Sequence, residues 1–301
     1  MSVPPTHRAQ PIALFCKSYR EDLLRARRLV ESVHRYNRDR LPFYLSVPAR
    51  DLSLFRETCA GLDVELLVDE DLVLANPRLD RELFGSLPGG ISQQIVKSEF
   101  WRLGLANAYL CLDSDCYFLR GFGAADFLAP DGTPYTVMHE AKELLHFAAL
   151  AGMGKVGRNW SDHSEEIKRL FGRAGRSWDF GPVPVIWSAA VWRDLDERYL
   201  VPRGLTILEA IKTHPGELGW YGEALLAYKS IPILPIEPVF RCYHYEEQFY
   251  FWERNGETDD KIAANYLGVC RQSNWDKELD PTPRFRFSKW RRRFKRALTG
   301  F

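Results

Sequence analysis

Two aspartates separated by one serine, Asp113 and Asp115, are the residues of this 301-residue chain whose spacing most clearly suggests chemistry. They follow the apolar run Tyr-Leu-Cys-Leu at residues 109–112, which predicts a buried strand. Because side chains alternate along an extended chain, the two carboxylates can point the same way and form an oxygen site for Mg²⁺ or Mn²⁺. Open α/β sheets bind ligands at the carboxyl ends of their strands, so this position favours a binding site.

Gln94 and Lys97 lie just before that strand, in the segment Ser-Gln-Gln-Ile-Val-Lys. We predict a helix here, with Ser92 as its N-cap and with Gln94 and Lys97 on adjacent faces. The Lys97 ammonium could offset the charge of a bound diphosphate. The alternative is a solvated helix face that Lys97 shares with Glu99.

His244 occurs late in the chain, in the motif Cys-Tyr-His-Tyr-Glu-Glu at residues 242–247. A neutral imidazole is a good ligand for Mn²⁺ or Zn²⁺, so His244 is a candidate third metal ligand. The competing interpretation is a half-buried histidine among tyrosines.

Glu223 ends the segment Gly-Trp-Tyr-Gly-Glu and is expected in the first turn of a helix, where the helix dipole favours an acid. It could instead deprotonate an acceptor hydroxyl, with Trp220 stacking on a sugar ring. His139 and Glu140, at the end of another predicted strand, are second candidates for acid–base work.

The elements that must position these residues alternate between strand and helix over the first 150 residues. Strands are predicted at residues 11–16, 43–47, 64–68, 109–112 and 135–139, and helices at 21–36, 51–61 and 93–105. Farther along, two prolines place the strand at 182–187 on a sheet edge, and helices are expected at 205–214 and 221–228. This alternation predicts an α/β fold with a mostly parallel central sheet and helices on both faces.

The segment Leu-Asp-Ser-Asp-Cys-Tyr at residues 112–117 resembles the DXD element of GT-A glycosyltransferases, and the helix before it is similar to one that precedes this element in several such families. The resemblance extends over roughly residues 10–250, with motifs near 92–118 and 219–246. It places the chain near the bacterial polysaccharide transferases. It implies a GT-A-like, Rossmann-like catalytic domain over residues 1–283, with a donor half at 10–140 and an acceptor half at 141–283.

The same resemblance implies a metal-dependent transfer of sugar from a nucleoside-diphosphate sugar to a glycan or lipid-linked acceptor in surface polysaccharide synthesis. Asp113 and Asp115 would hold Mn²⁺ or Mg²⁺, and Gln94, Lys97, Asp113 and Ser114 would approach the donor. His244 would be the third ligand, as in glycogenin-like enzymes, and Glu223 the base, like the acid that inverting enzymes place at a helix start.

Three other classes compete with this interpretation. A nucleotidyltransferase also uses paired carboxylates, but a third carboxylate and a phosphate-binding loop are not evident in the sequence. A phosphatase with a D-x-D-x-T motif is disfavoured because Tyr117 stands in place of the threonine. A non-catalytic carbohydrate- or membrane-binding module is the third, and it would tolerate loss of both aspartates.

Charge is distributed unevenly along the chain. The formal net charge is +1, but the tail at residues 284–301 carries eight Lys and Arg and no acid, which leaves −7 for the rest. As a helix, the tail would be basic and amphipathic with aromatics on one face, a pattern typical of binding to an anionic membrane surface. The acidic remainder argues against nucleic acid as a partner.

The expected location is the cytoplasm, with the enzyme peripheral on the inner face of the membrane. The six cysteines form no CxxC pair and are expected as free thiols in a reducing compartment. The sequence shows no secretory signal pattern, and no run reaches the roughly 18 apolar residues of a membrane span.

Overall fold

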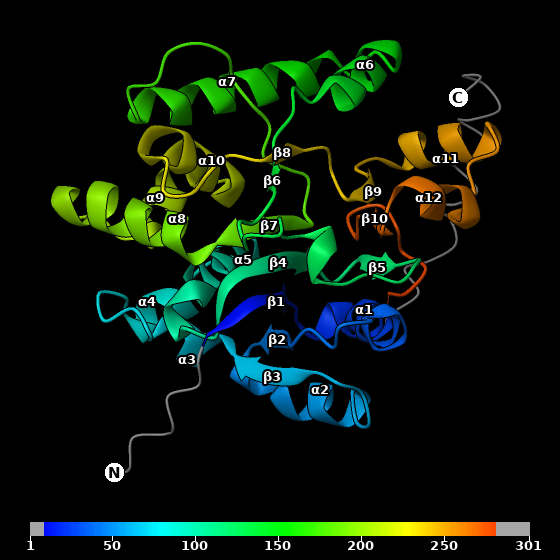
Figure 1. Cartoon of the computed structure of the whole chain (residues 1–301), viewed down its shortest axis with the longest axis horizontal. Helices are drawn as coiled ribbons and strands as arrows, with labels where there is room; N and C mark the ends of the chain where they lie inside the picture. The colour runs from blue at the N-terminus through cyan, green and yellow to red at the C-terminus, as the bar shows by residue number, and fades with distance from the viewer. Residues whose placement is uncertain (1–8, 281–301) are drawn as a thin grey trace.

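A computed structural model of the chain describes residues 9–280, so the basic tail at 284–301 lies outside the described residues. A five-stranded sheet in the order β3-β2-β1-β4-β7 forms its centre, and Figure 1 shows these strands from β3 at the bottom to β7 at the top. The strands are β1 (Gln10–Lys17), β2 (Phe43–Val47), β3 (Glu65–Val68), β4 (Ala106–Asp113) and β7 (Val185–Ser188). The first four are parallel, and β7 runs antiparallel to β4 at the edge. The predicted α/β class, the mostly parallel sheet and the edge position of β7 are therefore confirmed.

Helices cover both faces of this sheet because its strands bury alternate residues on opposite sides. In β1, Leu14 packs into the cluster formed with α1 (Leu23–Tyr36) and α2 (Leu52–Thr58). Its neighbour Phe15 packs into the cluster on the other face. That cluster contains α5 (Gly89–Glu99), α8 (Ala189–Leu195), α9 (Ile207–Thr213) and α10 (Glu217–Tyr228).

A smaller sheet brings the late part of the chain beside the paired aspartates. It has the order β5-β10-β9, formed by β5 (Cys116–Phe118), β10 (Gly268–Arg271) and β9 (Phe240–Tyr243). The strand β10 pairs antiparallel with β5 and parallel with β9. Figure 1 shows this sheet at the right, with α11 (Glu246–Arg254) and α12 (Asp259–Asn265) close to it.

The remaining elements are short or lie outside the two sheets. The strands β6 (Thr136–Val137) and β8 (Pro235–Ile236) pair with each other, and α6 (Lys142–Leu150) and α7 (Gly154–Leu170) lie at the top of Figure 1. The others are α3 (Asp69–Val73), α4 (Arg81–Gly85), the 3₁₀ helices η1 (Arg20–Asp22), η2 (Ala49–Asp51), η3 (Phe100–Leu103), η4 (Ala124–Asp126) and η6 (Val201–Arg203), and the π-helix η5 (Asp196–Leu200).

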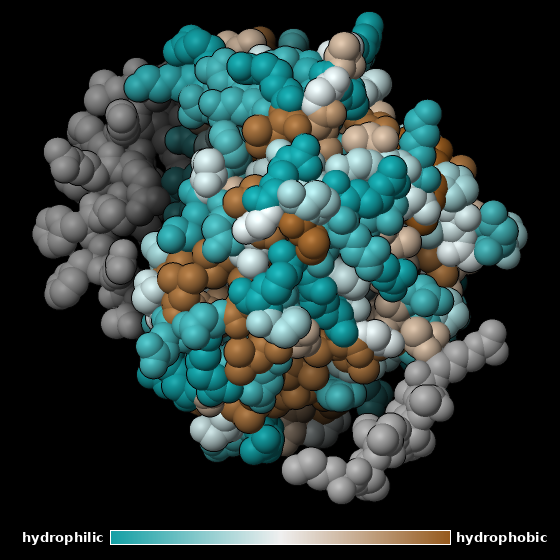
Figure 2. Space-filling model, turned by 90° about the vertical axis from the view of Figure 1, so that its left-hand side faces the viewer, coloured by the Kyte–Doolittle hydropathy of each residue, from teal (hydrophilic) through white to brown (hydrophobic). Residues whose placement is uncertain are grey.

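Figure 2 shows the side of the molecule opposite the carboxyl ends of the parallel strands, with apolar residues gathered in its lower half. The exposed Leu74, Leu83 and Val201 belong to or directly follow α3, α4 and η6, which lie toward this side in Figure 1. Across residues 9–280, no helix combines the length and the apolar character needed to cross a lipid bilayer.

Two predicted helix starts are wrong. The helix α5 begins at Gly89 after Pro88, so Ser92 lies inside it and is not its N-cap. Gly89 and Gly90 form the start of α5, and because glycine is a poor helix former, the sequence pattern did not predict a helix there. The helix α10 begins at Glu217, after Gly216 with a φ of +129°, a value that favours glycine. Glu223 therefore lies in the second turn of α10, and Glu217 takes the first-turn position.

Candidate active site

Asp113 and Asp115 lie at the carboxyl edge of the parallel sheet, as the sequence predicts. The strand β4 ends at Asp113 and β5 begins at Cys116, so Ser114 and Asp115 form the turn between the two sheets. The Asp113 side chain is 33% exposed, whereas Asp115 is only 8% exposed. One carboxylate is thus open to a ligand, and the other forms the floor of the site.

Asp115 is a buried carboxylate whose negative charge is not balanced by a basic side chain. Its Oδ2 accepts a 2.8 Å hydrogen bond from the Ser273 amide, and its Oδ1 accepts from the thiols of Cys270 at 3.3 Å and Cys116 at 4.0 Å. Within residues 9–280, no Lys or Arg forms an ion pair with it. Burial, and after it the negative charge of the nearby Asp113, raise the pKa of Asp115 to about 6. Buried charges in proteins are normally paired or bound to a metal, so this carboxylate fits a cation.

Lys97 holds the other carboxylate of the pair. Its Nζ lies 2.5 Å from Asp113 Oδ1 and 3.6 Å from Glu217 Oε1, and the side chain is almost fully buried. Burial alone would lower the pKa of Lys97, but the Asp113 and Glu217 carboxylates outweigh it and raise this pKa well above its usual value. Lys97 therefore stays protonated, and Glu99 pairs with Arg102 instead. Glu217 was not among the site residues predicted from the sequence, where an acid directly after Gly216 was the available signal.

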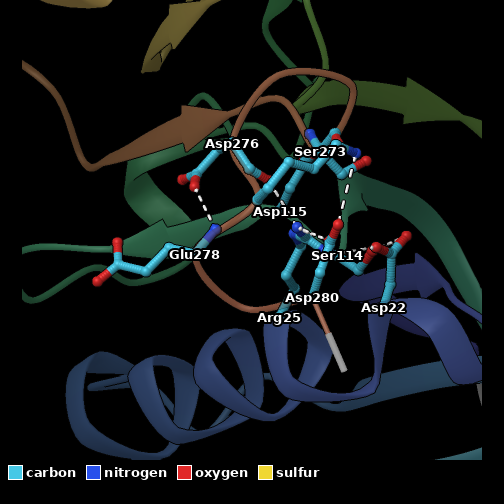
Figure 3. A network of polar contacts seen from close by, with 9 residues as sticks. Asp22, Arg25, Ser114, Asp115, Ser273, Asp276, Glu278 and Asp280 are labelled. Carbon is cyan, nitrogen blue, oxygen red and sulfur yellow. Dashed lines mark hydrogen bonds and ion pairs between the residues drawn. The ribbon is translucent and has the colours of Figure 1, made fainter. Parts of the chain in front are cut away.

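Ser114 connects the turn to the start of α1. Its Oγ donates to Asp22 Oδ2 at 3.3 Å, and Asp22 Oδ1 accepts from Arg25 at 2.9 Å. Arg25 in turn donates to Asp280 at 2.5 Å and to the Asp276 carbonyl at 2.6 Å. Figure 3 shows these contacts between α1 and the segment that follows β10, which we call the strap (residues 272–280). The strap closes one side of the site.

Gln94 supports the site from α5 rather than facing it. Its Oε1 accepts a 2.7 Å hydrogen bond from the Gly216 amide, and its Nε2 donates to the Gly90 carbonyl at 2.9 Å. Both ends of the amide are used. Gln94 thus fixes the start of α10, from which Glu217 reaches Lys97.

His244 lies beside the strap. Its Nδ1 accepts a 3.2 Å hydrogen bond from the Gln272 amide, and burial lowers its pKa, so the ring is neutral near pH 7. As the Gln272 amide is assigned, the ring proton is on Nε2, and the Nδ1 lone pair that could bind a metal is occupied by Gln272.

The structure does not gather the ligand atoms of Asp113, Asp115 and His244. Within residues 9–280, the metal-capable group whose ligand atoms lie within 4.8 Å of one another is Asp115, Cys116 and Cys270. Burial raises the pKa of the Cys116 thiol well above its usual value, which disfavours a thiolate ligand. All six cysteines are free thiols and buried.

A further polar group, which the sequence analysis missed, follows the neighbouring strands at the same edge. Ser46 of β2 donates a 2.6 Å hydrogen bond to Asp69 at the end of β3, and Lys17 of β1 lies 3.6 Å from that carboxylate. Tyr19 is 39% exposed, and Lys17 Nζ is 5.2 Å from its ring centre. The edge therefore offers an aromatic face and a charged pair beside the aspartates.

Residues 10–225 match the model of a family of unknown function, DUF6492. The chain belongs to this family. No curated protein matches it. The matched part of this DUF6492 protein contains Asp113, Asp115, Lys97 and Glu217, but not His244 or the strap.

Two solved structures resemble this DUF6492 protein. The apo form of mouse xyloside xylosyltransferase 1 is 12% identical, with 90% of this chain and 99% of that chain covered and a TM-score of 0.45. The apo structure of the bifunctional glycosyltransferase WbbM is 8% identical, with 91% of this chain covered and a TM-score of 0.49. The DUF6492 chain spans about half of WbbM, of which 48% is covered.

Glu223 and Trp220, the predicted base and the predicted sugar-stacking residue, make structural contacts in this DUF6492 protein. Both Glu223 oxygens accept from Arg173, at 2.5 and 2.7 Å, and Glu223 is only 3% exposed. Trp220 is buried against Phe171 and Tyr199, so the expectation that it stacks on a sugar is wrong. Both residues lie on α10, which packs against the core through them.

His139 and Glu140 are also engaged. The His139 Nε2 donates to the Gly181 carbonyl at 2.5 Å, and its Nδ1 accepts from the Ala141 amide at 3.0 Å. Glu140 forms ion pairs with Arg176 and Lys142. His139 therefore fixes the local backbone, since both of its ring nitrogens are used.

We expect Glu223→Gln to lower the free energy of unfolding of this DUF6492 protein by about 3–5 kcal/mol, the scale for removing one partner of a buried ion pair. A general base that acts on substrate would instead lower kcat while the urea midpoint stays unchanged. Urea unfolding and donor turnover on the same preparation separate the two roles. Recovery of stability in Glu223→Leu combined with Arg173→Leu would support the structural role.

Proposed function

We propose that this chain is a metal-dependent glycosyltransferase that transfers a sugar from a nucleoside-diphosphate sugar to a glycan or lipid-linked acceptor in surface polysaccharide synthesis. The observation that carries the proposal is the buried, unbalanced Asp115 next to the accessible Asp113 at the carboxyl edge of a parallel sheet. Ligands of open α/β sheets bind at this edge. The resemblance of residues 112–117 to the DXD element of GT-A enzymes points to the same chemistry.

Asp113 and Asp115 would hold Mn²⁺ or Mg²⁺, since their carboxylate oxygens suit hard cations and Asp115 Oδ2 keeps a lone pair beside its hydrogen bond from Ser273. A divalent cation bound there supplies stabilisation of the negative charge on the departing diphosphate. Lys97 fixes the orientation of Asp113 through their 2.5 Å ion pair, and Ser114 is positioned by Asp22 at the turn on which the donor would rest. His244 is proposed as a third ligand after its amide contact with Gln272 changes.

The nucleoside end of the donor is proposed to lie over Tyr19, whose exposed ring can stack on a base. Lys17 Nζ lies 5.2 Å from the centre of this ring and is held by its ion pair with the buried Asp69.

The first test is thermal-shift binding across nucleoside diphosphates and nucleotide sugars, with and without Mn²⁺, at pH 7.5 and pH 5. A ligand at a hundred times its dissociation constant stabilises the native state by about 2.7 kcal/mol. Because the pKa of Asp115 is about 6, cation binding at pH 5 must displace a proton, so the Mn²⁺-dependent shift is expected to be larger at pH 7.5. A shift with no donor, or one indifferent to Mn²⁺ at both pH values, would contradict the proposal.

A nucleotidyltransferase is the second candidate, because Glu217 provides the third carboxylate that the sequence did not reveal. The Glu217 carboxylate is paired with buried Lys97, and this pairing favours the glycosyltransferase over the nucleotidyltransferase. Release of pyrophosphate from a nucleoside triphosphate would identify the second candidate, and release of nucleoside diphosphate from a nucleotide sugar would identify the first.

The basic tail at residues 284–301 is proposed to hold the enzyme on the inner face of an anionic membrane, where a lipid-linked acceptor would be available. Each basic residue near such a surface contributes about 1 kcal/mol. We expect a chain ending at Pro283 to lose binding to phosphatidylserine vesicles and to keep donor hydrolysis. Vesicle binding equal to that of the full chain at 150 mM salt would refute the membrane role.

A further inference from the structure

A cavity of about 500 Å³ lies beside the candidate active site and shares His244 with it. Its wall includes the start of α6, residues 178–182, and the end of β9 with His244. Two connections tie it to the aspartates. His244 contacts Gln272, whose neighbour Ser273 binds Asp115. Cys242 in the wall is in register with Cys270, which donates to the same carboxylate.

Asp179 is a cavity carboxylate with an oxygen that is free to take a proton. Its backbone pairs with His139 in both directions, at 2.8 and 3.0 Å, and its Oδ1 accepts from the Gly181 amide at 2.9 Å. Within residues 9–280, Asp179 forms no ion pair, and its Oδ2 has no hydrogen-bond donor. Hydrogen bonds thus fix the backbone and the Oδ1 of Asp179, while its Oδ2 remains available.

The other carboxylates of the wall differ from Asp179 in their contacts or exposure. Glu140 is paired with Arg176 and Lys142, and Glu143 is paired with Arg241. Glu237 is exposed at the rim. Asp179 is therefore the half-buried carboxylate of the wall that lacks a cation.

Trp178 lies next to Asp179 in the same wall and is partly exposed. Within the described part of the chain, its ring stacks on no other aromatic ring and its indole nitrogen forms no hydrogen bond. Three other tryptophans, Trp187, Trp192 and Trp220, are instead buried in the core. An aromatic face open to a polar cavity is a platform on which a sugar ring can stack.

We infer that this cavity binds the acceptor sugar, with Trp178 under its ring and Asp179 as the base for its attacking hydroxyl. The inference rests on the proposed transferase function. Four carboxylates and two cations line the cavity, Glu140, Glu143, Asp179 and Glu237 against Lys142 and Arg241. This excess of negative charge favours a neutral or amino sugar and disfavours a uronic acid.

In the proposed transfer, one bond forms and one bond breaks at the anomeric carbon of the donor. The acceptor hydroxyl oxygen forms a bond to the anomeric carbon of the donor, and the bond from that carbon to the diphosphate oxygen breaks. The electron pair leaves on the nucleoside diphosphate, and the hydroxyl proton passes to Asp179 and then to solvent. A single displacement of this kind inverts the anomeric configuration, so the product is predicted to have the opposite configuration to the donor.

The test compares wild type, Asp179→Asn, Trp178→Ala and the surface control Glu82→Gln. Asparagine keeps the hydrogen bond from the Gly181 amide, so the backbone should be preserved. We expect Asp179→Asn to retain the Mn²⁺-dependent thermal shift with donor and to lose about 10²–10⁴-fold in transfer to methyl pyranosides. Trp178→Ala should raise the acceptor KM at least tenfold with kcat little changed, and Glu82→Gln should match wild type.

Acceptor binding is also measured without donor, by saturation-transfer NMR with methyl glucoside, methyl glucosaminide and methyl glucuronide. Binding of the first two that is lost in Trp178→Ala supports the cavity assignment. No binding, preference for the glucuronide, or transfer by Asp179→Asn above a tenth of wild type would overturn it, as would a product of retained configuration. A missing donor shift in wild type counts instead against the transferase proposal.

Discussion

Asp115→Asn is expected to abolish metal-dependent donor binding and to reduce transfer by about 10³-fold, while making the metal-free protein more stable. The loss of transfer follows from removing electrostatic stabilisation at the departing diphosphate. The gain in stability follows from the buried carboxylate, which no Lys or Arg within residues 9–280 balances.

The raised pKa of Asp115 determines how the stability of the metal-free protein depends on pH. In the folded chain Asp115 has a pKa of about 6, against an ordinary value of 3.8, so the folded state binds the proton more tightly. This carboxyl group destabilises the fold increasingly as the pH rises from about 4 to about 6, by roughly 3 kcal/mol in total. Urea unfolding without metal should therefore separate Asp115→Asn from wild type at pH 7.5 and not at pH 4. A variant less stable than wild type at pH 7.5 would contradict this account.

Lys97→Met is expected to lower the free energy of unfolding by about 3–5 kcal/mol, because it leaves Asp113 and buried Glu217 without their shared cation. Methionine fills a similar volume, so the loss reports charge rather than a cavity. The exposed Lys155→Met on α7 is the matched control and should change stability by less than about 0.5 kcal/mol.

A second substitution distinguishes this explanation from general damage to the core. Adding Glu217→Gln to Lys97→Met removes one of the two uncompensated acids, so the double variant should recover part of the lost stability. The recovery should be measured by urea unfolding at pH 7.5, where both acids are ionised in the unfolded chain. A double variant as unstable as the sum of both single variants would refute the shared role of Lys97.

The sequence predicted the parallel sheet and the position of the aspartates because both depend on local patterns. Continuous apolar runs define β1, β2 and β4, and Asp113 is the last residue of β4. Lys97 was a candidate from its place on the preceding helix, although its contact with Asp113 rather than a solvated face required the structure.

The contacts that complete the site could not be predicted, because they join distant parts of the chain. Ser273 reaches Asp115 across 158 residues, and Glu217 reaches Lys97 from a helix whose start depends on the backbone of Gly216. Trp220 was expected at the surface, yet α10 packs against both α7 and α8. A helix that contacts several neighbours is buried on more than one face, so its sequence lacks the simple apolar periodicity of a helix with one buried face. The proposed ligand role of His244 and the membrane role of residues 284–301 remain predictions.

The hydrogen bond from Ser273 to Asp115 also bears on when, during translation, the protein acquires its chemistry. The ribosome delivers about 5–20 residues per second, and a domain folds as a unit once enough of it has been made. The strands of the large sheet are complete once Ser188 has emerged, but Asp115 still lacks the amide of Ser273 and the pairing of β5 with β10. The turn that carries Asp115 is therefore completed only after roughly another quarter of the chain has been made.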